Sequence, residues 1–199
     1  MPEFRLPSKT SRQQAFELWK HSFMPMVTLT KTFDVSSLAE QPHFNARFVW
    51  AIARAASRIP EFYLLPDTEG FQLYDRLAVN VIVKTETGGI CDCLIPWNPD
   101  IRLFLDHYRQ LTEQAVRTGI CPEIENAGEY MVIGTSALIV TSLDSAVNAC
   151  SPWPNPYLIW GKLPPNGQLP VSFQFHHAQM DGYEAAVFLE TLQETVAAL

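Results

Sequence analysis

The sequence contains no run of lysine or arginine and no long apolar stretch. Its 14 Lys and Arg residues are outnumbered by 21 Asp and Glu residues, which gives a formal charge of −7. Nucleic-acid binding needs basic side chains that neutralise phosphates, so this charge argues against such a partner. No segment approaches the ~20 apolar residues of a membrane span, and the N-terminus lacks the apolar segment of a secretory signal. These absences favour a cytoplasmic protein without nucleic-acid or membrane partners.

Cysteine is also scarce, and the four residues are Cys91, Cys93, Cys121 and Cys150. The spacing Cys91-Asp-Cys93 places two thiols on one face of an expected strand, with no histidine cluster nearby to complete a metal site. Disulfides and zinc are the alternatives. Free, reduced thiols are favoured because a chain of 199 residues can bury a core without crosslinks. No metal is therefore expected.

The composition that remains is that of an ordinary folded protein, 47% hydrophobic and 18% charged, without repeats or linkers. We expect one domain over 1–199. Alternating apolar and polar residues, or β-branched runs, predict strands at 26–33, 77–84, 130–140, 157–163 and 169–175. Apolar residues at helical spacing predict helices at 11–20, 44–59, 101–117 and 182–198. Strands and helices do not alternate strictly, so the pattern indicates an α+β two-layer sandwich with a mixed, largely antiparallel sheet covered by helices on one face.

Two local features can be predicted more closely. The helix at 101–117 is expected to present one apolar side, formed by Leu103, Phe104, Tyr108 and Leu111. The segment Leu163-Pro164-Pro165-Asn166-Gly167 predicts a tight turn, because Asn-Gly accepts the positive φ that a hairpin requires. The strands on either side of this turn are therefore expected to pair.

The segment from Gln174 to Gly182, Gln-Phe-His-His-Ala-Gln-Met-Asp-Gly, is the chemically densest part of the chain. If the alternation of the preceding strand continues, His177 falls on the apolar face with Phe173, and His176 falls on the polar face. Desolvation favours a neutral imidazole, which is the form that a general base needs. The pattern thus favours His177 as a base. The alternatives are a structural pair, with one histidine capping the strand and the other at the surface, or a zinc site, which lacks a third ligand.

Asp181 has two compatible interpretations. It precedes the last expected helix, and Glu184 stands three residues later, which is the spacing of a capping box. Its carboxylate can also accept a charge-assisted pair from an arginine and so hold the turn that carries His177. Gly182 suits a tight turn or a close backbone approach.

The pattern His-His-x-x-x-Asp-Gly, which follows an expected strand and precedes an expected helix, resembles the motif of the chloramphenicol acetyltransferase family. That family belongs to a wider group of CoA-dependent acyltransferases, which includes condensation domains and dihydrolipoyl acyltransferase catalytic domains. Further segments resemble the family in the same order and extend the resemblance over nearly the whole chain: Arg12 to Glu17, Phe48 to Phe62, Phe104 to Tyr108, and Ser136-Ala137.

The resemblance implies an O-acetyltransferase that uses acetyl-CoA as co-substrate. His177 would remove the proton from an acceptor hydroxyl, which then attacks the thioester carbonyl. Ser136 would donate a hydrogen bond to the oxyanion of the tetrahedral intermediate, although on its own it reads as a polar strand residue. Asp181 would pair with Arg12 and hold the geometry of the turn.

The resemblance also assigns residues that bind the two substrates. Lys162 corresponds to a lysine near the CoA phosphates, a position where an acidic protein needs a cation. Trp19 corresponds to an aromatic wall of the acceptor pocket, and an apolar pocket would suit a nitroaromatic acceptor. Further candidates for this pocket are Phe23, Phe173, Met24, Met26, Val132 and Val171. The family further implies a homotrimer with active sites between subunits.

Three positions depart from the family pattern. His43 stands where a lysine is frequent, Ile159 replaces a threonine that helps to order the transition state, and Glu184 stands where a histidine often follows Asp-Gly. These departures affect the identity of the acceptor more than the type of reaction. The leading hypothesis is a chloramphenicol O-acetyltransferase. The alternatives are the same chemistry on another small alcohol or amine, and a non-catalytic trimeric binding protein on the same scaffold.

Overall fold

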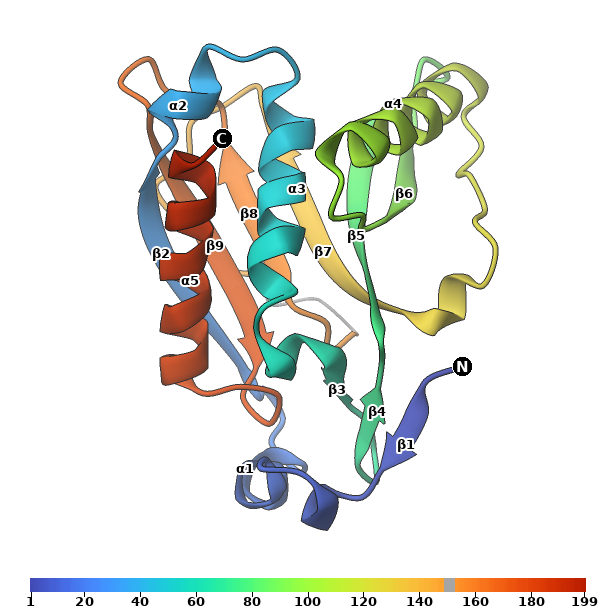
Figure 1. The fold of residues 1–199 in the computed structure, drawn as a ribbon, viewed down its shortest axis with the longest axis vertical. Coiled ribbons are helices and arrows are strands. Elements are labelled where there is room, and N and C mark those ends of the chain that lie inside the picture. Colours follow the sequence, from blue (N-terminus) through green and yellow to red (C-terminus); the bar gives the residue numbers. More distant parts are fainter. Residues whose placement is uncertain (149–152) are drawn as a thin grey trace.

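One six-stranded sheet forms the centre of the protein in this computed structural model, which describes residues 1–148 and 153–199 (Figure 1). Cys150 lies outside the described residues. The strand order is β2-β9-β8-β7-β5-β6, and β7 runs parallel to β5 and to β8 while the other neighbours are antiparallel. The strands are β2 (Met26–Asp34), β5 (Arg76–Lys84), β6 (Ile90–Pro96), β7 (Tyr130–Leu138), β8 (Tyr157–Gly161) and β9 (Gln168–His176).

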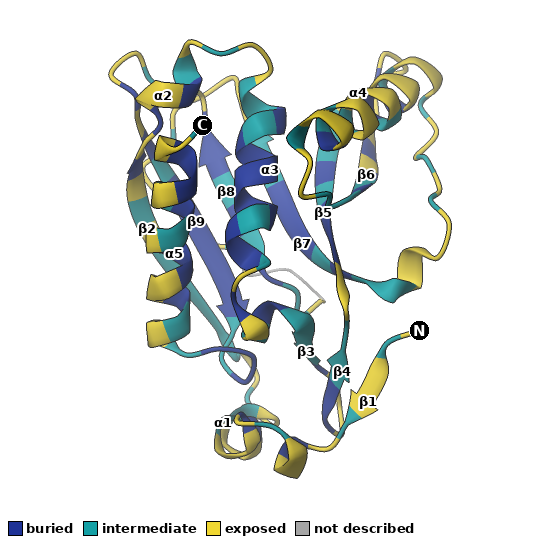
Figure 2. Cartoon of the chain, in the orientation of Figure 1, coloured by how far each residue is buried: buried dark blue, intermediate teal, exposed yellow. Residues whose placement is uncertain are grey.

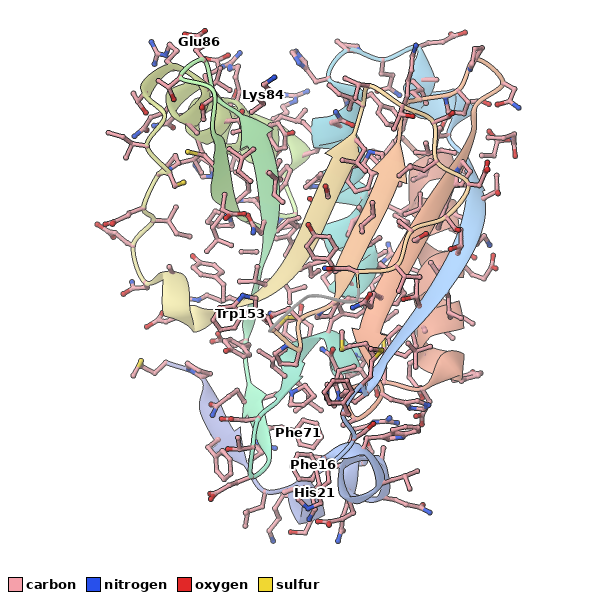
Figure 3. All side chains as sticks on the ribbon, turned by 180° about the vertical axis from the view of Figure 1, so that it is seen from behind. Phe16, His21, Phe71, Lys84, Glu86 and Trp153 are labelled. Carbon is pink, nitrogen blue, oxygen red and sulfur yellow. The ribbon has the colours of Figure 1, made fainter. Side chains whose placement is uncertain are left out.

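Helices cover one face of this sheet. The α-helices are α1 (Gln13–Trp19), α2 (Ser36–Ala39), α3 (Phe44–Ala56), α4 (Ile101–Thr118) and α5 (Gly182–Ala197). Figure 1 shows α3, α4 and α5 in front of the strands, and Figure 3 shows the opposite side, where the strands face the viewer. This confirms the expected two-layer α+β fold with a mixed, largely antiparallel sheet.

The core lies between the sheet and these helices, as the dark inner surfaces in Figure 2 show. Phe173 of β9 is fully buried, with its ring centroid 4.7 Å from that of Phe188 in α5 and 6.0 Å from that of Phe62. Burying one such side chain contributes ~1.5–3 kcal/mol. The same alternation turns Ser172, Gln174 and His176 toward the helix-free face.

A second, three-stranded sheet was not predicted. It consists of β1 (Glu3–Arg5), β4 (Phe71–Leu73) and β3 (Leu64–Pro66), strands too short to show a period in the sequence. Phe71 packs against Phe16 of α1 at 5.3 Å between ring centroids (Figure 3), and Ala178 joins them in one buried cluster. The small sheet thereby holds α1 beside the turn that follows β9.

Several local predictions need correction. The helix expected to reach Ile59 ends at Ala56, and Pro60 opens the 3-10 turn η2 (Pro60–Tyr63). The turn at the end of β8 has positive φ at Gly167 alone. Leu103 is 49% exposed because the buried face of α4 follows Phe104 and Ala115 instead.

The remaining short helices and the thiols complete the description. The two other 3-10 turns are η1 (Pro7–Lys9) and η3 (Ala127–Glu129). Cys91 and Cys93 are buried on one face of β6, as predicted, and they and Cys121 are free thiols. Within residues 1–148 and 153–199, no helix is long and apolar enough to span a membrane.

Candidate active site

The candidate site is built on the turn between β9 and α5. β9 ends at His176, and Asp181 is the N-cap of α5. The carboxylate of Glu184 accepts a hydrogen bond from the backbone N–H of Asp181 at 2.9 Å, and the predicted capping box is present. This cap satisfies backbone groups that a helix start leaves free, so the end of the turn has a defined geometry.

Arg12 fixes the turn through hydrogen bonds from its guanidinium group. Its guanidinium donates to both carboxylate oxygens of Asp181, from Nη1 at 2.7 Å and from Nη2 at 2.9 Å. It also donates from Nη2 to the carbonyl oxygen of His177 at 3.1 Å and from Nε to that of Ala178 at 3.2 Å. The hydrogen bond from Arg12 is the main cause that lowers the pKa of Asp181. The structure thus brings the predicted pair together, and the pair fixes the backbone that carries His177.

His177 is partly buried under the indole of Trp19. The two rings stack with centroids 4.5 Å apart and planes 13° apart. The backbone N–H of His177 donates to the carbonyl oxygen of Pro25 at 2.8 Å. Nδ1 lies 3.1 Å from Oδ1 of Asp181, yet it makes no hydrogen bond to any residue that the structure describes. Stacking on Trp19 therefore orients the imidazole, with the carboxylate of Asp181 beside Nδ1.

The alternation argument that favoured His177 is wrong, because β9 ends one residue before it. The desolvated histidine is His176, where burial, followed by the charge of His177, lowers the pKa to about 4. Nδ1 of His176 accepts a hydrogen bond from the backbone N–H of Ala178 at 3.0 Å. A turn does not continue the period of a strand, so the role of His177 depends on the resemblance and on its contacts, not on strand parity.

The expected acceptor-pocket residues separate into two groups. Phe173 and Val171 have no exposed surface and face the helices, so assigning them to a pocket wall is wrong. Phe23 is 99% exposed and lines a cavity of about 390 Å³ beside β9, together with Met24 and Met26. Alternation on β9 places Phe173 and Val171 in the core, whereas the segment after α1 leaves Phe23 outside it.

Ser136 and Lys162 lie far from His177 within one chain. Ser136 of β7 is in register with Ile159 of β8, which is next to Ser172 of β9. Four steps along β9, about 13 Å, separate Ser172 from His176, and His177 follows in the turn. Lys162 is exposed just after β8, where its backbone N–H donates to the carbonyl of Thr141 at 2.7 Å. Within one chain, the predicted site residues therefore form two groups that are separated along the sheet.

Two departures from the family pattern, His43 and Ile159, lie away from the turn of His177. His43 has a left-handed φ of 63° directly before α3. Ile159 is in register with Ser136 and faces the same side of the sheet. The ring of Tyr157 lies over Gly134, where a Cβ would come within 2.2 Å of it. A glycine at this position makes room for that ring.

Sequence reasoning missed the segment that crosses the helix-free face. The backbone N–H of Ala146 donates to Oγ of Ser172 at 2.8 Å. The amide side chain of Gln174 pairs with the backbone of Asn148, accepting its N–H at 3.0 Å and donating to its C=O at 2.9 Å. Polar residues alternating along β9 were the available signal, but a pattern in one strand does not name the distant backbone that satisfies it.

Metal chemistry has no visible site here. Among the residues that the structure describes, no group of three or more His, Cys, Asp or Glu side chains could hold a metal ion. The turn places the imidazole of His177 between the carboxylate of Asp181 and the ring of Trp19. This arrangement is suited to proton transfer.

Comparisons with known proteins identify the family of this chain. The family model for chloramphenicol acetyltransferase matches residues 7–193. Chloramphenicol acetyltransferase 2 of Escherichia coli is 28% identical over 196 residues, covering 92% of this chain and 91% of that protein. Chloramphenicol acetyltransferase 3 of the same organism is 26% identical over 198 residues, with the same coverage.

Solved structures show the same fold. A chloramphenicol acetyltransferase superimposes with a TM-score of 0.82 at 23% identity, covering 98% of this chain and 100% of that one. A dihydrolipoamide acetyltransferase from Azotobacter vinelandii superimposes with a TM-score of 0.66 at 17% identity, covering 99% and 90%. Since the family model spans nearly the whole chain, this protein belongs to the chloramphenicol acetyltransferase family and is an acyl-CoA-dependent acetyltransferase.

Proposed function

We propose that this enzyme, acting as one domain over 1–199, transfers the acetyl group of acetyl-CoA to a hydroxyl of chloramphenicol with His177 as general base. The observation that carries the proposal is the His177 imidazole, stacked on Trp19 and set beside Asp181 on a turn that Arg12 holds. Such a pre-oriented base contributes ~10²–10⁴-fold to a proton-transfer step.

In the proposed reaction, Nε2 of His177 takes the proton of the acceptor hydroxyl while the hydroxyl oxygen attacks the thioester carbonyl of acetyl-CoA. The carbonyl oxygen becomes an oxyanion, to which the hydroxyl of Ser136 donates a hydrogen bond worth ~3 kcal/mol. Collapse of the intermediate breaks the C–S bond, and the proton on His177 goes to the CoA thiolate. The products are the acetyl ester and free CoA, and the imidazole returns to its neutral form.

We further propose that the enzyme is a homotrimer whose active sites lie between subunits. About 13 Å of strand separates the level of Ser136 from His176, and His177 lies beyond it in the turn; this is too far for His177 and Ser136 of one chain to act on one carbonyl. A second copy could place its Ser136 and Lys162 beside the first copy's His177. Exposed apolar side chains on and near the helix-free face offer surface for such a contact, namely Phe23, Met24, Leu138, Ile139, Val140, Val147 and Trp153.

Lys162 supports the cofactor part of this proposal. It is an exposed cation at the Ser136 end of the sheet, in a protein of net charge −7. A compact ammonium suits a phosphate, so we assign Lys162 to the phosphates of CoA. We place the reaction in the cytoplasm, where the free thiols of Cys91, Cys93 and Cys121 would stay reduced.

The first experiment measures release of free CoA thiol from acetyl-CoA, with and without chloramphenicol. Release that depends on chloramphenicol is the expected result, and a lower sensitivity of an expressing host to the antibiotic would extend it to cells. Release only with other alcohols or amines would support the alternative acceptor. That alternative has one specific argument in its favour, because Phe173 is in the core and the expected apolar wall is smaller. No release with any acceptor would leave a non-catalytic binding protein.

The second experiment tests the shared site by mixing two inactive subunits. Ser136→Ala and His177→Ala chains are co-expressed, and activity is compared with that of each variant alone. If the two groups act from different chains, each mixed trimer recovers one site in three, which is about a quarter of all sites in a random one-to-one mixture, by the symmetry of a closed ring. No recovery would mean that both groups come from one chain. A monomer in sedimentation at micromolar concentration would exclude the shared site.

A further inference from the structure

The cavity of about 390 Å³ beside β9 is bordered by the first histidine of the motif, His176, which the proposed reaction does not use. Its rim is apolar and includes Phe23, Met24 and Val147, whereas Thr28, Gln174 and His176 supply polar groups. No charged side chain of the described residues lines it. A cavity of this composition suits a neutral ligand with an apolar body and few polar atoms.

The amide of Gln174 is already engaged. Its Oε1 accepts from the backbone N–H of Asn148 at 3.0 Å and from the hydroxyl of Thr28 at 3.3 Å, and its Nε2 donates to the carbonyl of Asn148 at 2.9 Å. The hydroxyl proton of Thr28 is used in the same contact. These two side chains therefore shape the cavity without offering a free donor.

His176 differs from these two side chains because one ring nitrogen, Nε2, carries a proton that it can donate. Its Nδ1 accepts the backbone N–H of Ala178 at 3.0 Å, which places the ring proton of the neutral imidazole on Nε2. Burial lowers the pKa of this histidine to about 4, so the ring stays neutral near neutral pH. Nε2 makes no hydrogen bond within the described chain, and it is not among the fully buried polar atoms. The N–H at Nε2 thus has a fixed position and no partner among the described residues.

We infer that Nε2–H of His176 donates a hydrogen bond to an oxygen on the acceptor substrate, and that the cavity takes a neutral aromatic arm ending in a group such as nitro or carbonyl. The inference rests on the proposed function, because it places the non-reacting end of the acceptor next to the turn that carries His177. A neutral donor does not favour anions as a charged one would, and the apolar rim contacts the ring of the arm. His176 is thus a binding residue, and His177 performs the proton transfer.

The test compares two acceptors that differ in one atom that can accept a hydrogen bond. They are chloramphenicol analogues with a para-acetyl or a para-isopropenyl group in place of nitro, which are planar and nearly equal in shape. The wild type should favour the acetyl compound by about fivefold in kcat/KM, a ratio within the range of one neutral hydrogen bond. His176→Phe should bring this ratio close to one through the KM values of the two compounds, because both then lack the donor, and His176→Gln, which keeps an N–H donor, should restore part of the ratio.

Thr28→Val provides the control, since it alters the same cavity and leaves the imidazole in place. It should keep the preference for the acetyl compound. Should His176→Phe not fold, His176→Leu takes its place in the comparison. The inference is overturned if the kcat/KM ratio of the two compounds stays the same when the imidazole is removed, or if the ratio changes through kcat alone. This holds even when acetyl transfer itself is fast.

A binding measurement separates this inference from the proposed function. If no acceptor releases CoA thiol, the proposed function fails, and the affinity of the same two compounds is then measured through the change in tryptophan fluorescence of the protein. A wild-type preference for the acetyl compound that disappears in His176→Phe still supports the donor at His176. Equal affinity in the wild type contradicts it.

Discussion

Replacing Arg12 with methionine tests whether the turn after β9 is held by a single guanidinium. Arg12 is 6% exposed and makes four hydrogen bonds, two to Asp181 and two to backbone carbonyls. Removing one partner of a buried ion pair costs ~3–5 kcal/mol. The side chain of Asp181 is 47% exposed and regains water, so a loss of about 3 kcal/mol is expected. For a chain of this size, that loss lowers Tm by about 6–12 °C.

The same change should reduce catalysis in molecules that remain folded. The carbonyls of His177 and Ala178 lose their donor, and the turn relaxes. A displacement of about 1 Å at a catalytic group can cost ~10²-fold in rate. We therefore expect kcat for CoA thiol release to fall by about that factor at a temperature well below the Tm of the variant. Arg12→Lys keeps the charge but not the fork of donors, so it should recover only part of both losses.

The loss of stability in Arg12→Met should depend on pH. Hydrogen bonding from Arg12 lowers the pKa of Asp181 in the folded protein. A carboxylate with a depressed folded pKa stabilises the fold above its unfolded pKa of ~3.9, and this contribution disappears as pH falls through the folded value. The Tm difference between wild type and Arg12→Met should therefore be full near pH 6 and shrink below about pH 4.

Arg5 provides a matched control for calorimetry and kinetics. It pairs with Glu3 at 3.1 Å on the surface, and its side chain is 41% exposed. Such exposed pairs contribute ~0–1 kcal/mol, so Arg5→Met should change Tm by no more than about 2–4 °C and leave kcat unchanged. The reasoning is refuted if Arg12→Met behaves like Arg5→Met, or if it lowers Tm while kcat per folded molecule stays at the wild-type value.

Four other variants test the remaining assignments. His177→Ala should lower kcat by ~10²–10⁴-fold or more with folding intact, whereas His176→Ala should act far more mildly on kcat; equal losses would contradict the assignment of the base. Ser136→Ala should lower kcat by ~10²–10³-fold with KM nearly constant, since the oxyanion exists only near the transition state; a rise in KM alone would make Ser136 a binding residue. Lys162→Gln should raise KM for acetyl-CoA by about tenfold and less in high salt, and an unchanged KM at low salt would remove Lys162 from the phosphate site. His176→Gln should flatten the fall of Tm between pH 6.5 and pH 4, because in the wild type only the unfolded chain gains that proton as pH falls; an unchanged slope in calorimetry would show that His176 does not carry the effect.

Much of the fold can be predicted from the sequence because its information is local. Periods of two and of 3.6 residues locate the long strands and helices to within a few residues, as in β2 and α4. The capping box at Asp181 and Glu184 is a pattern of spacing, and the structure contains it. Strands of three residues, such as β1 and β4, carry no period, and only their pairing defines them.

The order of the residues that match the family motif can likewise be predicted from the sequence, since the motif can be identified from residue types alone. Their spatial arrangement cannot be predicted in this way. Strand parity assigned desolvation to His177, but the strand stops at His176, and burial by distant segments decides which imidazole loses its solvent. Phe173 shows the same limit: its apolar character suits a pocket or a core equally, and packing against Phe62 and Phe188 places it in the core.

The sequence by itself determined the longer elements, the cap of α5 and the residues that match the family motif. Only the tertiary structure decided that Arg12, Trp19 and Pro25 meet the turn of His177, while Ser136 and Lys162 lie toward the other end of the sheet. The physical reason is that spacing constrains contacts over one or two turns of chain. Contacts such as Arg12 with Asp181, 169 residues apart, depend on how all the intervening elements pack.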